Sequence, residues 1–310
     1  MKKLLIVCGL ALLSTGAFAQ LGDFRIGAGV GVGTTGIDID VSATYGEYLG
    51  ARFGVDIFPS IKVKTDLDLK TQDKQQAVTN LINKANDVNT QWQATGHTGN
   101  LIDLTGLPNR LPDKMDVEGK WTNTTWHLLF DVYPFGARSS FHATVGAYFA
   151  PKKIVKVYNK DNGFLSPIVN WNQQVNNLTP AQRQWIDTNA PGADIKMVGA
   201  ELGDYFITPD PADGGNVEAS IEVGGFRPYL GIGFGRAVPK KRIGCQFDLG
   251  VQFWGTPKVY APTYNKTTDS YQREELKKEN TTGDAGDALK IISKISVYPV
   301  LNFRLVGRIL

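Results

Sequence analysis

The chain has 310 residues, of which 42% are hydrophobic and 20% charged, with 33 basic against 30 acidic residues. This near balance argues against a nucleic-acid partner, because such binding normally requires a strongly basic face. Beyond residue 19 no segment holds the roughly 18 consecutive apolar residues of a membrane helix. Any membrane-embedded part therefore has to be a closed barrel.

The first residues have the three parts of a secretory signal peptide. A basic start at Lys2 and Lys3 precedes an apolar core at 4–13, and Ala17-Phe18-Ala19 forms a small-residue cleavage site. We therefore predict a cleaved signal peptide at 1–19 and a single barrel domain at 20–310.

The stretch RIGAGVGVGTTG at 25–36 carries glycine at every second position from Gly27 to Gly33. A phosphate-binding loop needs Gly-x-Gly-x-x-Gly, but Val32 occupies the third glycine position. A repeat of two is the period of a strand, in which alternate side chains face one side. The stretch therefore predicts a strand and no nucleotide site.

The segment 51–70 alternates most strictly, with apolar residues at odd positions and mostly polar residues at even ones. It is longer than the average strand of about 5–6 residues and than the about 9–11 residues that cross a membrane. We interpret it as one strand that spans the bilayer and projects beyond it. Proline donates no ladder hydrogen bond, so we expect local bulges at Pro59 and Pro299.

The same alternation recurs further along the chain. It is clear at 141–150, 243–255 and 295–310, and weaker at 118–135 and 216–235. In the last of these, Gly224-Gly225 shifts the apolar set from odd to even positions, which is typical of a bulge.

Short and long connections alternate between these strands. Short ones lie at 45–48, 134–140 and 236–242, and long ones at 71–115, 159–216 and 261–290. Outer-membrane barrels have short periplasmic turns and long extracellular loops, which produces this pattern. If GTTG at 33–36 is a tight outer turn, the barrel has eight antiparallel strands and both chain ends are periplasmic; a single strand over 24–45 would leave seven.

The long connections contain their own patterns. Residues 73–92 show apolar residues at helical spacing, and 178–188 offers Thr179 as N-cap before Pro180. A short charged helix is predicted at 271–280. Residues 195–210 are predicted to form a strand pair within the second long connection or the outer end of the wall. Trp92, Trp171 and Trp185 fall in the long connections. For these tryptophans we favour packing or a place at the membrane interface over stacking on sugars or anchoring a partner.

With these features, the chain resembles small, porin-like outer-membrane β-barrel proteins of Gram-negative bacteria. The resemblance lies in GVGTTGIDIDVSATYGEYLGARFGVDIFP, HLLFDVYPF, RPYLGIGFGRA, DLGVQFWGTPKV and ISVYPVLNFRL. It covers most of the wall and little of the long connections. It implies an all-β transmembrane barrel, an outer-membrane location and the lipid bilayer as a partner, but no activity.

Catalytic or metal chemistry has few candidate residues. The histidines are His97, His127 and His142, and Cys245 is the one cysteine of the predicted mature chain, so no metal-ligand spacing appears. His127 and His142 fall on inner faces, as an acid–base pair or, as we favour, as polar filling. We expect no catalytic, cofactor-binding or metal site.

Ten charged residues are predicted to point inward, five acidic and five basic. They are Asp38, Asp40, Arg52, Asp56, Lys62, Lys64, Asp131, Asp248, Arg304 and Arg308. An eight-stranded barrel is just wide enough for side chains to fill. We therefore favour an ion-paired plug over an open pore.

The resulting hypothesis is a structural wall whose extracellular loops bind a ligand or partner protein or cap the barrel, without catalysis. A small porin that uses the polar lumen is the main alternative. An outer-membrane enzyme and a soluble lipocalin-like barrel remain further alternatives, the last with its apolar face inward.

Overall fold

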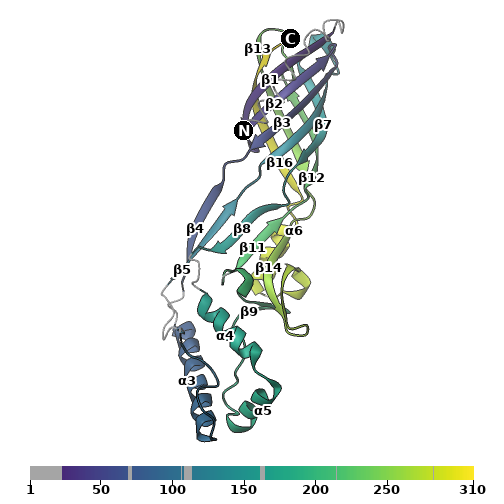
Figure 1. The fold of residues 1–310 in the computed structure, drawn as a ribbon. Coiled ribbons are helices and arrows are strands. Elements are labelled where there is room, and N and C mark those ends of the chain that lie inside the picture. The colour runs from purple at the N-terminus through teal and green to yellow at the C-terminus, as the bar shows by residue number, and fades with distance from the viewer. Residues whose placement is uncertain are drawn as a thin grey trace.

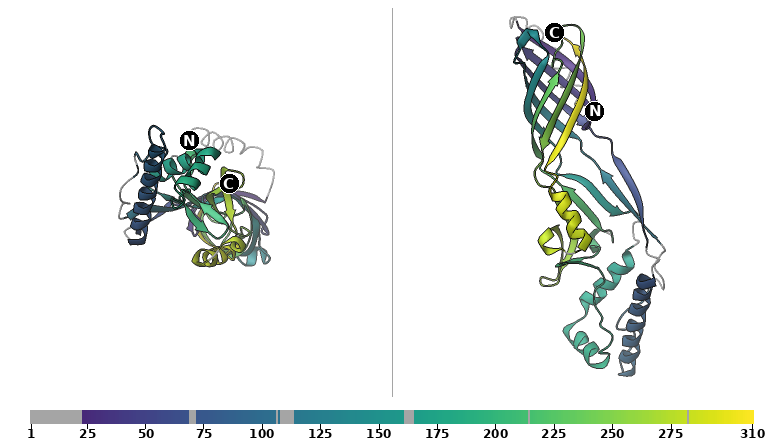
Figure 2. Two further views of the ribbon diagram at one scale, coloured as in Figure 1. Left: turned by 90° about the horizontal axis from the view of Figure 1, so that it is seen from below. Right: turned by 180° about the vertical axis from the view of Figure 1, so that it is seen from behind.

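The computed structural model describes residues 23–68, 72–105, 107, 114–160, 165–213, 215–281 and 283–310 (Figure 1). The predicted signal peptide at 1–19 lies outside these residues. The molecule is elongated: a barrel occupies one end, a second sheet continues from it, and helices lie at the far end (Figures 1 and 2).

Eight antiparallel strands close into a barrel, as the alternation predicted. Their order around the wall is β1-β16-β13-β12-β7-β6-β3-β2. The strands are β1 Phe24–Gly33, β2 Gly36–Tyr45, β3 Leu49–Ile57, β6 Thr125–Val132, β7 Phe141–Phe149, β12 Phe226–Phe234, β13 Ile243–Phe253 and β16 Val297–Arg308. The β1–β2 hairpin turns tightly after Gly33, which confirms the interpretation that gave eight strands.

The alternating glycines of β1 make room for large side chains inside the barrel. A Cβ atom on Gly29 would lie 2.6 Å from the guanidinium of Arg304, and one on Gly31 would lie 2.8 Å from that side chain's Cγ. A side chain at either position would therefore displace Arg304 from the lumen. The glycine repeat of β1, which has some of the glycines of a nucleotide-binding loop, is therefore needed to make room for Arg304 in the lumen.

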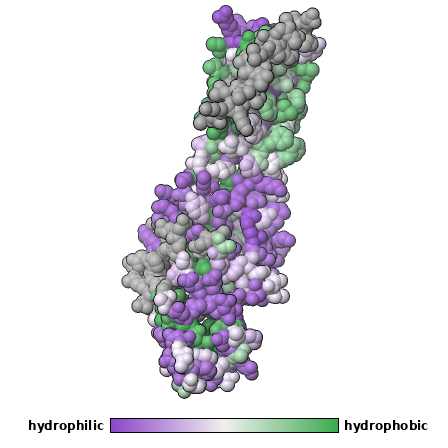
Figure 3. All heavy atoms as spheres, in the orientation of Figure 1, coloured by the Kyte–Doolittle hydropathy of each residue, from purple (hydrophilic) through white to green (hydrophobic). Residues whose placement is uncertain are grey.

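The outside of the barrel is apolar. Wall residues such as Val41, Leu230 and Leu249 are about half exposed, while their chain neighbours point inward and are buried. Large aromatic residues gather toward both rims: Tyr45, Tyr48, Phe135, Phe141 and Phe234 at the end with short turns, and Trp126, Phe149, Phe226 and Phe253 at the other. The visible wall in Figure 3 is correspondingly green, above a mostly purple second sheet.

An apolar band between two aromatic girdles, wrapped around a closed barrel, is the architecture of bacterial outer-membrane proteins. This confirms the predicted fold class and the outer-membrane location. A soluble lipocalin-like barrel is wrong for this chain, because the aliphatic rows face outward and the polar rows face inward.

Both described ends of the chain lie at the rim with short turns. The Ile26 amide donates to the Leu310 carbonyl at 3.1 Å, and the Arg308 amide donates to Arg242 in the β12–β13 turn at 2.8 Å. The long connections all leave from the opposite rim (Figure 1). This asymmetry matches the predicted alternation of short and long loops.

The predicted long strand at 51–70 is wrong as a single element. β3 ends at Ile57, and after Phe58–Ser60 the chain enters β4 Ile61–Asp68, which belongs to another sheet. Pro59 lies in this break, because it cannot donate a ladder hydrogen bond. Pro299, by contrast, stays in β16 opposite Val251 without the expected bulge.

The second sheet, here called the outer sheet, has the order β4-β5-β8-β11-β14-β10-β9, with β15 paired to β14. The remaining strands are β5 Lys114–Trp121, β8 Lys153–Asn159, β9 Ala200–Leu202, β10 Tyr205–Ile207, β11 Glu218–Glu222, β14 Lys258–Asn265 and β15 Ser270–Leu276. Five of its strands are continuous in the chain with β3, β6, β7, β12 and β13, and they keep the same neighbours. The outer sheet is thus the wall of the barrel, opened on one side and continued beyond the membrane.

Two further predictions about secondary structure are wrong. The expected charged helix at 271–280 is mostly β15, followed by a 3-10 turn at Lys278–Asn280, because pairing with β14 overrides local propensity. Gly224-Gly225 is the break between β11 and β12 and not a bulge within one strand. The strand pair predicted at 195–210 is confirmed by β9 and β10.

The α-helices of the described residues are α3 Gln72–Ala94, α4 Ser166–Asn177, α5 Pro180–Asn189 and α6 Gly283–Ser293. The predictions of α3 and α5 are confirmed, and Thr179 forms a capping box with Gln182 at the start of α5. None of the described helices is long and apolar enough to cross a bilayer.

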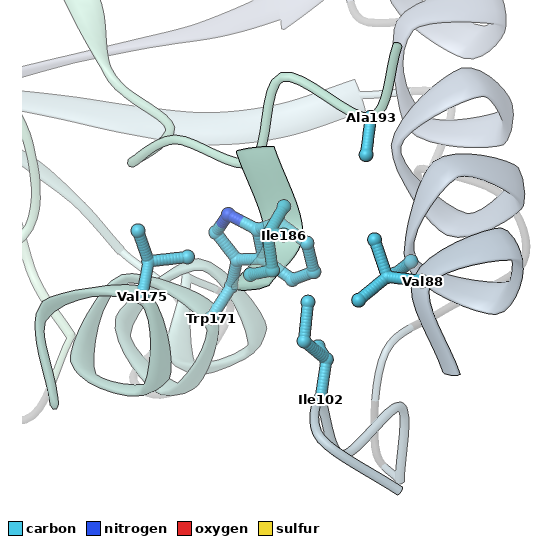
Figure 4. Packing of buried hydrophobic residues seen from close by; sticks show 7 residues of the cluster. Val88, Ile102, Trp171, Val175, Ile186 and Ala193 are labelled. Carbon is cyan, nitrogen blue, oxygen red and sulfur yellow. The ribbon is translucent and has the colours of Figure 1, made fainter. Parts of the chain in front are cut away.

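Helices α3, α4 and α5 share a hydrophobic core of their own. Val88, Ile102, Trp171, Val175 and Ile186 converge there (Figure 4). The Trp171 indole donates to the Lys196 carbonyl at 2.9 Å, which fixes the ring between the helices. This group, here called the helical unit, is therefore packed and not a loose loop, and its tryptophans serve packing.

Candidate functional site

The lumen is the first candidate site, and polar side chains fill it. Seven of the ten predicted inward charges are buried in the barrel: Asp38, Asp40, Arg52, Asp56, Asp131, Asp248 and Arg304. The prediction is wrong for Lys62 and Lys64, which lie in the outer sheet and are exposed, and for Arg308, which lies exposed at the rim. The predicted charges that are buried in the barrel are therefore five acidic and two basic residues, and not five of each.

One cluster fills the half of the lumen nearer the short turns. Arg52 donates to both oxygens of Asp248, at 2.8 and 3.1 Å, and to Asp131 at 2.7 Å. Thr144 also donates to Asp131, at 2.7 Å. His142 Nε2 lies 2.8 Å from Asp248 and its Nδ1 lies 3.3 Å from the Ser140 carbonyl. We call this the Arg52 cluster.

A second cluster fills the half nearer the outer rim. Arg304 donates to both oxygens of Asp40, and Asn302 donates to Asp38 at 2.9 Å. His127 Nδ1 lies 2.8 Å from Asp56, and its Nε2 lies 3.9 Å from Asp38. Gln246 accepts from Arg304 and lies 3.1 Å from His142 Nε2, so it links the two clusters. We call this the His127 cluster.

The outer mouth of the barrel is also filled. Tyr148 and Tyr229 pack edge to face against each other, together with Leu129 and Val300. Arg227 is fully buried, with hydrogen bonds to Asn123 and to the carbonyls of Gly224 and Pro151. These contacts continue the filling of the lumen up to the level of the outer sheet.

His127 and His142 do not form the acid–base pair considered from the sequence. Each hydrogen-bonds a different aspartate, in a different cluster. Both rings are almost completely buried, at 2% and 0% exposure. His97, to which no role was given, stacks on Trp92 in the helical unit, with 3.5 Å between ring centroids.

The short turns are joined by one acidic residue. Glu47 accepts from Arg25 at 2.8 Å and is paired with Arg236 and Lys240 at 3.0 and 3.1 Å. Partial burial raises the pKa of Glu47, but the hydrogen bonds from Arg25 and Lys240 and the charge of Arg236 outweigh it. The pKa of Glu47 is therefore below its usual value.

Two pockets lie outside the barrel. One of about 280 Å³ lies between β9–β10 and β14–β15 and is lined in part by Glu201, Phe206, Lys266 and Glu274. Another of about 350 Å³ lies between α3 and the segment after α5. Lys266 lies over the Phe206 ring at 4.7 Å and 3.6 Å from Glu201, so the first pocket has an aromatic, charged rim.

Sequence reasoning missed the neutral members of the lumen clusters. Thr144, Gln246 and Asn302 were placed on inner faces by their alternation, but nothing distinguished them as charge partners. Their role depends on which strands face one another across the lumen, and a single strand's pattern does not contain that information.

The sequence matches no protein-family model and no curated protein. In solved structures, the chain is similar to CarO2 of Acinetobacter baumannii, at 14% identity and a TM-score of 0.40, over 92% of this chain and 98% of that one. CarO of Acinetobacter baumannii gives 13% and 0.38, over 91% and 97%. A major outer membrane protein from Thermus thermophilus gives 12% and 0.34, over 92% and 98%.

These likenesses are too distant to carry an argument about function. The transmembrane fold follows from the closed barrel and its apolar band, and the functional proposal depends on what fills the barrel and what projects from it.

Proposed function

We propose that the barrel is a closed membrane anchor that presents the outer sheet and the helical unit at the cell surface for binding. The observation that carries this proposal is the filled lumen. From Thr144 in the Arg52 cluster to Arg227 at the mouth, the inward side chains are buried, and many of them are hydrogen-bonded across the lumen. Such an interior favours an anchor over a passage.

The part outside the barrel supports a binding role. It has a continuous sheet, a helical unit with its own core, and two pockets. A mobile cap would not need the buried Trp171 or the capped helix α5. Ordered structure of this extent on a rigid wall is typical of surfaces that recognise a ligand or partner protein. We expect no catalysis there.

The orientation of this part follows from the turns. Short turns of outer-membrane barrels are periplasmic and long connections extracellular. We therefore expect the outer sheet and the helical unit to face the outside of the cell, with the described chain ends in the periplasm.

A small porin is the alternative function, and electrical recording separates the two. The purified protein is incorporated into planar bilayers, with an open porin incorporated in the same way as control. A filled lumen predicts no steady conductance, because Arg52, Asp131 and Asp248 are bonded across the path. Stable channels that persist across independent preparations would reject the anchor and support the porin.

A further inference from the structure

We propose that the His127 cluster is a binding site for one divalent transition-metal ion inside the barrel, with His127 Nε2 and Asp38 Oδ1 as direct ligands. One donor atom each of Asp38, Asp40 and His127 lies within 4.8 Å of the others, and all three residues are buried. Imidazole and carboxylate together suit ions such as Zn²⁺.

The first argument is an unsatisfied carboxylate oxygen. Asp38 is 1% exposed, and its Oδ1 has no hydrogen-bond partner among the described residues. The Oδ1 atom of the neighbouring Asn302 also has none. A buried acceptor without a partner costs about 1–3 kcal/mol, and more when it is charged. An ion at this point would satisfy Asp38.

The second argument is the orientation of His127. Its Nδ1 lies 2.8 Å from Asp56, whereas its Nε2 lies 3.9 Å from Asp38 Oδ1, beyond hydrogen-bond distance. An ion about 2.0–2.2 Å from each donor bridges such a gap. The bond to Asp56 fixes the tautomer that leaves Nε2 free to coordinate, as carboxylates behind metal-binding histidines commonly do.

The third argument is a contrast in charge between the two clusters. In the Arg52 cluster, two aspartates face the Arg52 guanidinium, and His142 Nε2 lies 2.8 Å from Asp248 and 3.1 Å from Gln246. In the His127 cluster, Asp38, Asp40 and Asp56 face one guanidinium, that of Arg304. The His127 cluster thus has three carboxylates to one guanidinium, against two in the Arg52 cluster, and a divalent ion would offset this excess of carboxylates.

No spacing of residues in the sequence predicts such a site, because its ligands come from strands far apart in the chain. Asp38 and Asp40 belong to β2 and His127 to β6, with β3 and its Asp56 between them in the wall. An ion at this site would therefore crosslink β2 and β6, which are not adjacent in the wall.

The test measures metal content in the full chain, purified without an affinity tag. The protein is folded into detergent with equimolar Zn²⁺, passed over a desalting column and analysed by mass spectrometry for zinc. We expect about one ion per chain and a higher unfolding temperature than in protein folded with a chelator. X-ray absorption should show one imidazole nitrogen among oxygen ligands.

Matched variants locate the ion. His127→Gln and Asp38→Asn should lose stoichiometric zinc, and Asp56→Asn should bind about 10–100-fold more weakly, because it removes the partner that orients His127. His142→Gln is the control in the Arg52 cluster and should retain the ion. Heat-modifiable migration on gels confirms that each variant is folded. Wild-type protein without bound zinc, or equal zinc in His127→Gln and His142→Gln, would overturn the proposal.

Discussion

At the scale of single residues, the barrel depends on buried ion pairs. Arg52 is 2% exposed and bonds two aspartates on different strands. A buried ion pair contributes little against a well-packed apolar replacement, but removing one partner leaves the others charged and unpaired. The aspartates of the Arg52 cluster therefore depend on this one arginine.

Arg52→Met is predicted to destabilise the barrel by about 3–5 kcal/mol, because Asp131 and Asp248 remain buried without their guanidinium. The measurement is urea unfolding in lipid vesicles, followed by tryptophan fluorescence. Arg25→Met is the control, since the Arg25–Glu47 pair lies at the rim and should cost about 1 kcal/mol or less. An equal loss of unfolding free energy in the two variants would show that the ion pairs in the lumen do not stabilise the barrel more than the pair at the rim.

At the scale of elements, the short turns are held as one unit. Glu47, in the β2–β3 turn, pairs with Arg25 of β1 and with Arg236 and Lys240 in the β12–β13 turn. Arg236 also donates to the Gly136 carbonyl in the β6–β7 turn and stacks on Tyr133. Turns that are distant in sequence thus share one network at the rim with short turns.

Glu47→Gln should therefore have a pH-dependent effect. The folded pKa of Glu47 is lowered, so its stabilisation is present above its unfolded pKa and is lost as pH falls through the folded value. At pH 7 we expect a loss of about 0.2–1 kcal/mol, and at pH 3 a much smaller one. Unfolding of wild type and variant at both pH values measures this, with exposed Glu279→Gln as control. A loss that does not change with pH would assign the effect to packing.

At the scale of the whole molecule, the same strands continue from the lipid-facing barrel into a polar sheet outside the bilayer. Within the barrel the outer face of the wall is aliphatic and meets lipid, whereas beyond the mouth the wall opens and its strands become polar. Two of the five breaks lie at Phe58–Ser60 between β3 and β4 and at Gly224-Gly225 between β11 and β12. The apolar band therefore ends where the closed wall ends, and we propose that the part beyond it is the binding surface.

Cysteine labelling checks this orientation in living cells. In a Cys245→Ser background, Thr267→Cys in the exposed β14–β15 turn should react with a membrane-impermeant maleimide on intact cells. Lys241→Cys, in the exposed β12–β13 turn, should react only after the outer membrane is permeabilised. The opposite pattern would place the outer sheet and helical unit in the periplasm and end the surface-binding proposal.

The residue pattern alone predicts the wall of the barrel. A period of two places lipid-facing and lumen-facing side chains on opposite sides of every strand, so the eight strands, their inner and outer faces, the tight β1–β2 turn and the loop alternation could all be predicted. The capped helix α5 could be predicted too, because Thr179 and Pro180 are local signals.

Which side chains meet across the lumen, and which strands are neighbours, becomes visible only in the folded molecule. Alternation shows that Asp38 and His127 point inward, but not that they meet, and it did not show that β4 leaves the barrel at Pro59 or that 271–280 pairs as β15. Charge partners and strand neighbours depend on closure of the wall, which brings together residues such as Asp38 and Asn302, which are 264 positions apart in the sequence. Local periodicity carries no information about such distant contacts, and the clusters within the lumen consist of them.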